Sequence, residues 1–442
     1  MKAKIEFIKR HRLIFEIALL FLLLGGFFSF LLVNQTYFFY YLSSRLIYYF
    51  LLVFVFIFAY LFFTVINKNK YYYLRAVLIW FAVIYFICVM MISHILIRHN
   101  TGDDFYVHDS VVLTEAATKF LSEGRNFYQE NYYDTPYAIY KGIFYDVNGP
   151  RHDNPAMTQY PYLPFIPVFS LPLYHLFSNL FGFFDERFVH LLLFLILLPI
   201  LWQLPKKKEN KILFFYTFCF NPFFLIFFVA GYNDIFVFFW LILCLYFLRR
   251  KIFLPSAVAL ALACAAKQSA WLILPFYFFY IYYHQDNSQS VSQKFFGVIK
   301  KIWPFLVVFL IIFAPFALWG LNDLIDDIYR KEAGTASLSY PISGLGLSFI
   351  LLKLKLVKTA WDYFPFWIFQ IFLGLPGLLI LIKVQKRINT VWYIFFAYGL
   401  FLFVFWYFSR YFHDSHFGFL TMILISAFFL FDQASRDNIL NN

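Results

Sequence analysis

The sequence predicts an all-α membrane protein that crosses the bilayer many times. Of its 442 residues, 62% are hydrophobic and only 14% are charged. Uncharged runs of about 20 residues recur along the chain, and that length is enough to cross a ~30 Å hydrocarbon core. Runs such as LLVFVFIFAYLFF (51–63) do not alternate between polar and apolar positions, so they do not fit the strands of a transmembrane barrel.

The apolar runs divide into about twelve predicted spans. The first run follows MKAKIEFIKRHR and has no A-x-A cleavage site, so we expect an uncleaved anchor with a cytosolic N-terminus. The predicted spans are residues 13–33, 45–66, 75–97, 188–204, 212–229, 234–250, 252–266, 270–284, 302–319, 364–384, 390–408 and 416–432.

The distribution of basic residues predicts the orientation. A cytosolic N-terminus places NKNKYYYLR, PKKKENK, RRK and KVQKR on the cytosolic side. Together with the two termini and residues 284–302, these segments hold more than half of the 36 Lys and Arg residues, as the positive-inside rule expects. We therefore expect a single integral membrane domain over residues 1–442, with two long outer loops at 98–187 and 320–363.

One proline-rich segment affects this count. The segment YPYLPFIPVFSLPLYHLF (160–177) contains four prolines, which remove amide donors that a helix exposed to lipid needs. A full span here would also place PKKKENK on the outer side. We expect a re-entrant or interfacial segment that returns to the outer face. The prolines are Pro161, Pro164, Pro167 and Pro172.

Composition also excludes some classes of function. The four cysteines all fall inside apolar runs and form no CxxC pair, so neither a metal site nor a disulfide framework is indicated. The formal charge of +12 comes from basic residues clustered between apolar runs. That clustering is typical of membrane orientation, so we expect no nucleic-acid partner.

The first outer loop opens with three aspartates. After them, SVVLTEAATKFLSEG (110–124) has the apolar spacing of an amphipathic helix that ends at Gly124. Asp109 or Ser110 would cap this helix, so Asp109 has a structural role open to it. Asp103 and Asp104 precede the helix; they are either a solvated turn after Gly102 or functional groups.

Further polar residues are predicted on the same side. Asp234 stands where one apolar run passes into the next, and it either caps a helix or faces a ligand. Lys267 and Gln268 stand at the turn between two short apolar runs, where an unpaired lysine is costly unless it snorkels or meets an anion. Late in the chain, FSRYFHDSHFGF brings together Arg410, His413, Asp414 and His416.

The late cluster and the second loop differ in what they suggest. The two histidines could ligate a metal, but no fourth ligand is evident, so a cluster that faces a phosphate fits better. In the second loop, an apolar stripe predicts an interfacial helix whose acids form its solvated face; the stripe is Leu321, Leu324, Ile325 and Ile328. Carboxylates and cations on one side of a membrane suit a reaction with a general base and an anionic leaving group.

These motifs, in this order, resemble the GT-C superfamily of multi-pass glycosyltransferases. The resemblance lies in DDFYVHDSVVLTEAATKFLSEGRNFYQENYY (103–133), in QYPYLPFIPVFSLPLYHLF (159–177), and in the outer aspartate and hairpin lysine of residues 231–279. Within the superfamily, the chain is most similar to the bacterial polyprenyl-phosphate-mannose mannosyltransferases and to the catalytic subunit of GPI mannosyltransferase I. The acidic pair is adjacent here, whereas the family pattern is Asp-x-Asp.

The resemblance implies a hexosyltransferase that uses a polyprenyl-phosphate-linked sugar, with mannose first among the hexoses, and passes it to a lipid or glycan acceptor at the outer face. In a prokaryote this would be the plasma membrane. Asp104 is the implied general base, with Asp103 assisting. The implied substrate-binding residues are Asp109, Tyr160, Tyr162, Asp234, Lys267, Gln268, Arg410, His413 and His416.

The cofactor and two rival functions stay open at the level of sequence. No cofactor is certain, and the altered acidic motif leaves a divalent-cation requirement open. A ligase or polymerase acting on an undecaprenyl-diphosphate glycan would use arginines and a histidine in outer loops, as RYFHDSH (410–416) offers. A transporter would instead carry charges at mid-span, which this sequence almost lacks.

Overall fold

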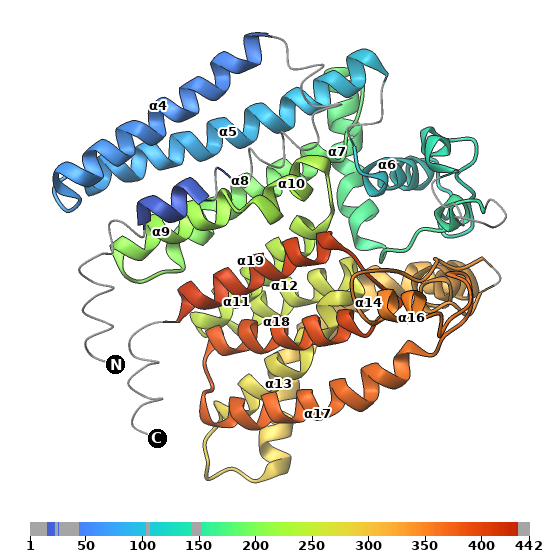
Figure 1. Cartoon of the computed structure of the whole chain (residues 1–442). Coiled ribbons are helices and arrows are strands. Elements are labelled where there is room, and N and C mark those ends of the chain that lie inside the picture. Colours follow the sequence, from blue (N-terminus) through green and yellow to red (C-terminus); the bar gives the residue numbers. More distant parts are fainter. Residues whose placement is uncertain are drawn as a thin grey trace. The chain divides into compact units, whose positions relative to one another are not determined.

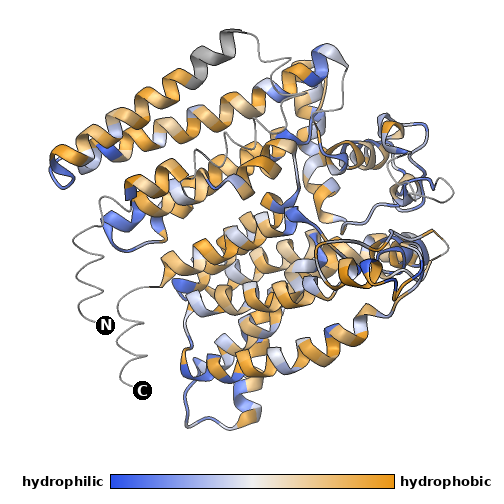
Figure 2. Cartoon of the chain, viewed as in Figure 1, coloured by the Kyte–Doolittle hydropathy of each residue, from blue (hydrophilic) through white to orange (hydrophobic). Residues whose placement is uncertain are grey.

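The computed structural model describes residues 16–22, 25, 44–102, 107–142, 152–336 and 338–431. Within these residues the chain is mainly helical, which confirms the all-α prediction, and its one sheet is a two-residue parallel pair (Figure 1). Asp103 and Asp104 lie outside the described residues, as does most of the predicted first span. Figure 2 shows mainly hydrophobic helices, with hydrophilic residues gathered toward the turns and loops.

The chain divides into two compact units, which we describe separately. The first unit comprises Met1–Val107 and Phe194–Ala230, and the second comprises His108–Leu193 and Gly231–Asn442.

The first unit is built on an antiparallel helix pair. Helix α4 (Ser44–Asn67) packs along α5 (Tyr72–Thr101). The buried guanidinium of Arg75 joins them, because its Nε donates to Oγ1 of Thr64 at 2.7 Å and its Nη2 to the hydroxyl of Tyr60 at 3.1 Å. Helices α9 (Lys208–Cys219) and α10 (Pro222–Ala230) pack against α5.

The predicted span 212–229 is broken in the structure. Helices α9 and α10 meet at a 50° bend. Pro222 lacks an amide donor and begins α10, and the side chain of Asn221 accepts a hydrogen bond from the amide of Phe223. The sequence therefore starts a new helix at this point.

The second unit contains a bundle whose helices run side by side. Figure 1 shows α11, α12, α18 and α19 together, and α12 also packs against α14. The helices of this unit are α6 (Asp109–Ser122), α7 (Phe165–Phe181), the start of α8 (Arg187–Gln203), α11 (Asp234–Arg249), α12 (Phe253–Ala266), α13 (Leu274–Tyr283), α14 (Val291–Ile325), α15 (Lys331–Ala333), α16 (Leu347–Lys353), α17 (Phe366–Arg387), α18 (Val391–Tyr407) and α19 (Asp414–Leu430).

Short elements connect these helices. The strand β1 (Ser343–Gly344) pairs in parallel with β2 (Tyr411–Phe412), in the register Ser343 to Tyr411. A single π-helical turn, η5 (Asp326–Arg330), follows α14. The 3₁₀ helices are η2 (Pro136–Tyr140), η3 (Pro155–Thr158) and η4 (Gln268–Ile273).

Three helical stretches of the described residues are long and apolar enough to cross a membrane, or four if the bent α9–α10 pair counts as one span. The three are Tyr72–Thr101, Val291–Ala333 and Phe366–Arg387. Several other predicted spans, such as 252–266 and 390–408, correspond to apolar helices of 10–17 residues. These findings fit a membrane protein, and the number of twelve spans stays a prediction.

The proline-rich segment is helical from Phe165 onward. Pro164 caps α7, and Pro172 lies within it. Only the beginning of this helix, including Phe165 and Ile166, is fully buried, whereas residues near its end such as Leu180 are exposed. The re-entrant or interfacial placement of this segment stays a prediction.

The amphipathic helix of the first loop forms, but a different residue caps it. Helix α6 ends as predicted, because Gly124 adopts φ +73° and its amide donates to the carbonyl of Leu121 at 3.0 Å. Its N-cap is His108, whose Nδ1 accepts from the amide of Ser110 at 3.2 Å. The expectation that Asp109 or Ser110 would be the cap is therefore wrong, and Asp109 is the first residue inside the helix.

Candidate functional site

The candidate site begins at the open end of the α11–α12 hairpin. Because these helices are antiparallel, the first residue of α11, Asp234, lies beside Lys267, which directly follows α12. The ammonium of Lys267 donates to Oδ1 of Asp234 at 2.7 Å and to Oδ1 of Asn233 at 3.0 Å. The structure thus pairs the hairpin lysine with the aspartate that the sequence placed on the same side.

The ring of Tyr162 covers the same lysine. Nζ of Lys267 lies 5.4 Å from the centre of this ring, within the range of a cation–π contact. Burial raises the pKa of the Tyr162 phenol well above its ordinary value, and the charges of Asp109 and Asp234 raise it further. Tyr162 therefore stays protonated and can donate a hydrogen bond.

The start of α6 brings a second carboxylate to the site. Oδ1 of Asp109 lies 3.1 Å from Nδ1 of His108, and Oδ2 accepts a 3.4 Å hydrogen bond from the hydroxyl of Tyr137. Asn154 donates to that same hydroxyl at 3.1 Å, which holds the phenol in place. The Asp109 side chain is one-third exposed, so it is both oriented by neighbours and open to a ligand.

A ring stack links the start of α6 to the start of α11. The rings of His108 and Tyr232 lie 3.6 Å apart between centres and are tilted by 32°. Gly231 makes this approach possible, since it adopts φ +94° and a Cβ there would lie 2.9 Å from Cγ of Arg187. The two carboxylate-bearing turns are therefore held against each other.

Several charges act on the imidazole of His108. Burial lowers its pKa below the ordinary 6.5, and Lys267 lowers it further, while the carboxylates of Asp109, Asp234 and Asp414 oppose this shift. The contact of His108 with Asp109 and its ring stack on Tyr232 place the imidazole beside the start of α11, where Asp234 pairs with Lys267. The imidazole is neutral at pH 7, and its unprotonated Nδ1 is the atom that accepts the capping hydrogen bond from the amide of Ser110.

The late histidines complete the cluster. Helix α19 begins with a reciprocal cap, in which the amide of His413 donates to Nδ1 of His416 at 3.1 Å. The ring of His413 also contacts the hydroxyl of Ser343, with 3.3 Å between Nε2 and Oγ. Burial lowers the pKa of His413, which Asp414 and Asp109 oppose. Both histidines are thus tied to the start of α19, and His413 also contacts the second loop through Ser343.

Three predicted substrate-binding residues hold the loops together instead. The side-chain amide of Gln268 donates to the carbonyls of Pro161 at 3.2 Å and Ile328 at 3.0 Å, so it joins the two long loops. Tyr160 is fully buried, and its backbone amide donates to Asp327 at 2.8 Å. The contacts of Gln268 and Tyr160 position the two loops around the site, and they leave little of either side chain for a ligand.

Arg410 is the third of these residues. Only 4% of it is exposed, and its guanidinium donates to the backbone carbonyls of Tyr340, Asp362 and Ala360. The sequence suggested that this cation faces a phosphate. In the structure its hydrogen bonds secure the second loop beside β2, and all three of its guanidinium nitrogens donate to backbone carbonyls.

The acids of the second loop are not all solvated, which corrects the sequence-based expectation. Asp327 is 2% exposed and pairs with Lys331 at 2.9 Å. Asp323 accepts from the amide of Gln129 in the first loop at 2.9 Å. The residues of the predicted apolar stripe also differ in their surroundings, because Leu324 is fully buried whereas Leu321 is half exposed.

Four residues of the site were not predicted from the sequence: His108, Tyr137, Tyr232 and Asn233. Only two had a usable signal. His108 directly precedes a predicted helix, where a capping residue belongs, and Asn233 adjoins Asp234. Tyr137 and Tyr232 reach the site through packing between separate segments, which one sequence does not reveal.

Metal ligands are not assembled in the described part of the chain. None of its His, Cys, Asp and Glu side chains form a group of three or more that could hold a metal ion. Asp103 and Asp104 lie outside the described residues, so the question of a divalent cation stays open. Comparison with protein-family models, with curated proteins and with solved structures finds no match to this chain.

Proposed function

We propose that this chain is an inverting glycosyltransferase of the GT-C type, which moves a hexose, mannose first, from a polyprenyl phosphate to a lipid or glycan acceptor. The observation that carries the proposal is the meeting of three separated motifs. The ring of His108, at the acidic start of α6, stacks on Tyr232 just before α11; the first residue of α11 pairs with Lys267, and α11 also packs against α19, which begins with the histidines.

Lys267 is suited to stabilise the leaving phosphate. An ammonium has three N–H donors, and here two of them are used by Asn233 and Asp234. The third can donate to a phosphate oxygen as negative charge develops on it. The pairing with Asp234 fixes the direction of the donors before the substrate arrives, which reduces the cost of orienting them.

The acceptor needs a carboxylate base. Asp104 is the candidate that the resemblance supplies, and Asp103 would assist it. Asp104 stands four positions before His108 in the sequence, with three residues between them. Asp109 is a second carboxylate, at the edge of the same cluster.

The proposed step balances as a single displacement. The acceptor hydroxyl gives its proton to the carboxylate, and its oxygen forms a bond to the anomeric carbon. The bond from that carbon to the phosphate oxygen breaks, and the electron pair leaves on the lipid phosphate. Attack from the opposite face inverts the anomeric centre.

The proposed setting is a multi-pass protein with this cluster at the outer face of the membrane, which is the plasma membrane in a prokaryote. The three long apolar helices support the membrane location. Basic residues such as Arg249, Arg250 and Lys251 lie at the end of the α11–α12 hairpin opposite to Lys267, which supports a cytosolic position for that end.

The burial of Arg410 bears on the rival ligase or polymerase. That function would need the arginine of RYFHDSH (410–416) to face a diphosphate, but its guanidinium donates to three loop carbonyls. Glycosyl transfer from a monophosphate donor does not require Arg410 to leave this position. The arrangement therefore favours the glycosyltransferase.

The test uses the purified full chain and labelled donors. Polyprenyl-phosphate-mannose and polyprenyl-phosphate-glucose are each supplied with a membrane lipid extract, and release of polyprenyl phosphate and labelling of the extract are measured. We expect release from at least one donor, reduced at least tenfold in Lys267→Gln. Transfer only from an undecaprenyl-diphosphate glycan would establish the ligase, and movement of label across vesicles without bond cleavage would establish a transporter.

A further inference from the structure

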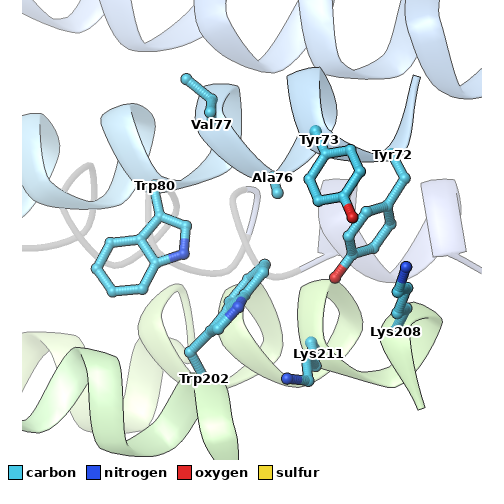
Figure 3. Close-up of a pocket in the computed structure, with 8 residues that line it drawn as sticks. All are labelled: Tyr72, Tyr73, Ala76, Val77, Trp80, Trp202, Lys208 and Lys211. Carbon is cyan, nitrogen blue, oxygen red and sulfur yellow. The ribbon is translucent and has the colours of Figure 1, made fainter.

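The first unit contains a pocket that is separate from the proposed active site. It has a volume of about 410 Å³, which lies in the range of small-molecule sites, and is open to the surface (Figure 3). Three elements line it: the start of α5, the end of α8 and the start of α9. The lining residues are Tyr72, Tyr73, Ala76, Val77, Trp80, Trp202, Lys208 and Lys211.

One side of the pocket is positively charged. Lys208 and Lys211 both line it, and within the described part of the chain neither makes an ion pair with a carboxylate. Nζ of Lys208 lies 5.5 Å from the ring centre of Tyr73 and 5.8 Å from that of Tyr72. Figure 3 shows both tyrosine hydroxyls directed toward the α9 side, where Lys208 lies. The Lys208 ammonium with two hydroxyl donors beside it, and a second lysine in the same lining, make a site for an anion.

The other side of the pocket is apolar and aromatic. The rings of Trp80 and Trp202 lie 5.7 Å apart, and Trp80 stacks on Phe215 at 4.4 Å, so this wall is firmly packed. An inorganic anion would make no favourable apolar contact with such a wall. A ligand that carries an anionic head and an apolar body would contact both sides.

An exposed apolar stripe leads away from the pocket along α5. Tyr73, Val77 and Phe81 follow one another at intervals of four residues, and their exposed fractions are 72%, 49% and 58%. Side chains with this spacing lie on one face of a helix. The first two line the pocket, so an acyl chain could continue from it along the same face.

We propose that this pocket binds the phosphate head group of an anionic membrane phospholipid, with the acyl chains lying along the α5 stripe. The pocket adjoins the basic segments that the sequence places on the cytosolic side, and anionic lipids give that leaflet its negative surface potential. The site is independent of glycosyl transfer, because none of its residues belongs to the proposed active site.

Lipid titration of the delipidated full chain, followed by native mass spectrometry, tests the proposal. The probes are phosphatidylglycerol, phosphatidylcholine with the same acyl chains, and inorganic phosphate. For the first bound phosphatidylglycerol, we expect Lys208→Gln/Lys211→Gln to weaken binding by roughly tenfold or more. Val77→Trp keeps both charges but obstructs an exposed wall of the pocket, and it should cause a similar loss.

The matched control is Lys206→Gln/Lys207→Gln, which removes the same charge from the same segment but from residues that do not line the pocket. It should leave the first binding event unchanged within about twofold. If both double variants lose the same affinity for phosphatidylglycerol, the binding comes from a general basic surface, and the proposal is overturned. Equal binding of phosphatidylcholine, or displacement of the lipid by inorganic phosphate, would also overturn it.

Discussion

Lys267 and Asp234 form a salt bridge, with 2.7 Å between Nζ and Oδ1, across the open end of the α11–α12 hairpin. Their side chains are 24% and 16% exposed, so the pair is partly shielded yet reachable. A partly buried lysine without a partner would be costly, and the aspartate reduces that cost. The same pairing leaves one N–H of the ammonium available for a further acceptor.

This pair yields the first prediction. Lys267→Gln should lose most sugar transfer, whereas Asp234→Asn keeps the ammonium and an acceptor oxygen and should retain more of it. Turnover and Tm are measured for both variants. A purely structural pair would lower Tm and turnover equally in the two variants, and that result would remove the catalytic role of Lys267.

The second prediction distinguishes the role of Asp104 from that of Asp109. Asp104→Asn should lower kcat by roughly 10²–10⁴-fold with KM nearly unchanged, because asparagine keeps the shape but not the basicity. Asp109 does not cap α6, so Asp109→Asn tests its charge alone. Replacing a charge-assisted hydrogen bond from Tyr137 by a neutral one should cost about tenfold. If only Asp109→Asn is inactive, Asp109 is the base.

The third prediction concerns pH. The folded chain holds the pKa of His108 below 6.5, so on acidification the unfolded chain takes up this proton first. The contribution of His108 to stability is therefore complete above about pH 6.5 and decreases as the pH falls below it. Protonation of Nδ1 would also remove the acceptor that caps α6.

His108→Asn provides the comparison, since asparagine caps helices but does not titrate. Tm is measured at pH 7.5 and pH 5.5. We expect a smaller fall in Tm on acidification in the variant than in the parent chain. His413 is shifted in the same direction and is present in both proteins, so it does not affect the difference. An equal fall in both would show that His108 is not the titrating group.

The fourth prediction compares two arginines near the second loop. Arg410→Ala should destabilise the protein by about 2–3 kcal/mol, because it deprives three partly buried loop carbonyls of a charged donor. Arg330 forms an exposed pair with Asp326, and Arg330→Ala should cost less than about 1 kcal/mol. Thermal unfolding in detergent measures both, and similar losses would contradict the loop-securing role of Arg410.

The fifth prediction tests sidedness. A cysteine replacing the exposed Glu123, at the end of α6, should react with a membrane-impermeant maleimide in intact cells. A cysteine replacing Ser288, in the turn between α13 and α14, should react only after permeabilisation. The parent chain gives the background, since three of its four cysteines are buried. Labelling in the opposite sense would invert the topology and move the cluster to the cytosolic side.

Local patterns predicted much of the helical structure. Apolar runs predicted α11, α12 and α18 to within a few residues, because a helix in apolar surroundings needs an uninterrupted apolar sequence. Gly124 correctly predicted the end of α6, since a left-handed residue there favours glycine. The break at Pro222 was also readable in principle, but the apolar run through it concealed the bend.

The sequence by itself determined that this is a helical, strongly apolar chain whose charged residues lie mainly between the apolar runs and toward the helix ends. Only the tertiary structure decided which of those charges meet. In the folded chain Lys267 pairs with Asp234, Arg410 and Gln268 hold the loops, and His108 caps α6. The reason is physical: helix formation depends on neighbours within a few residues, whereas a charge finds its partner through packing between segments far apart in the chain.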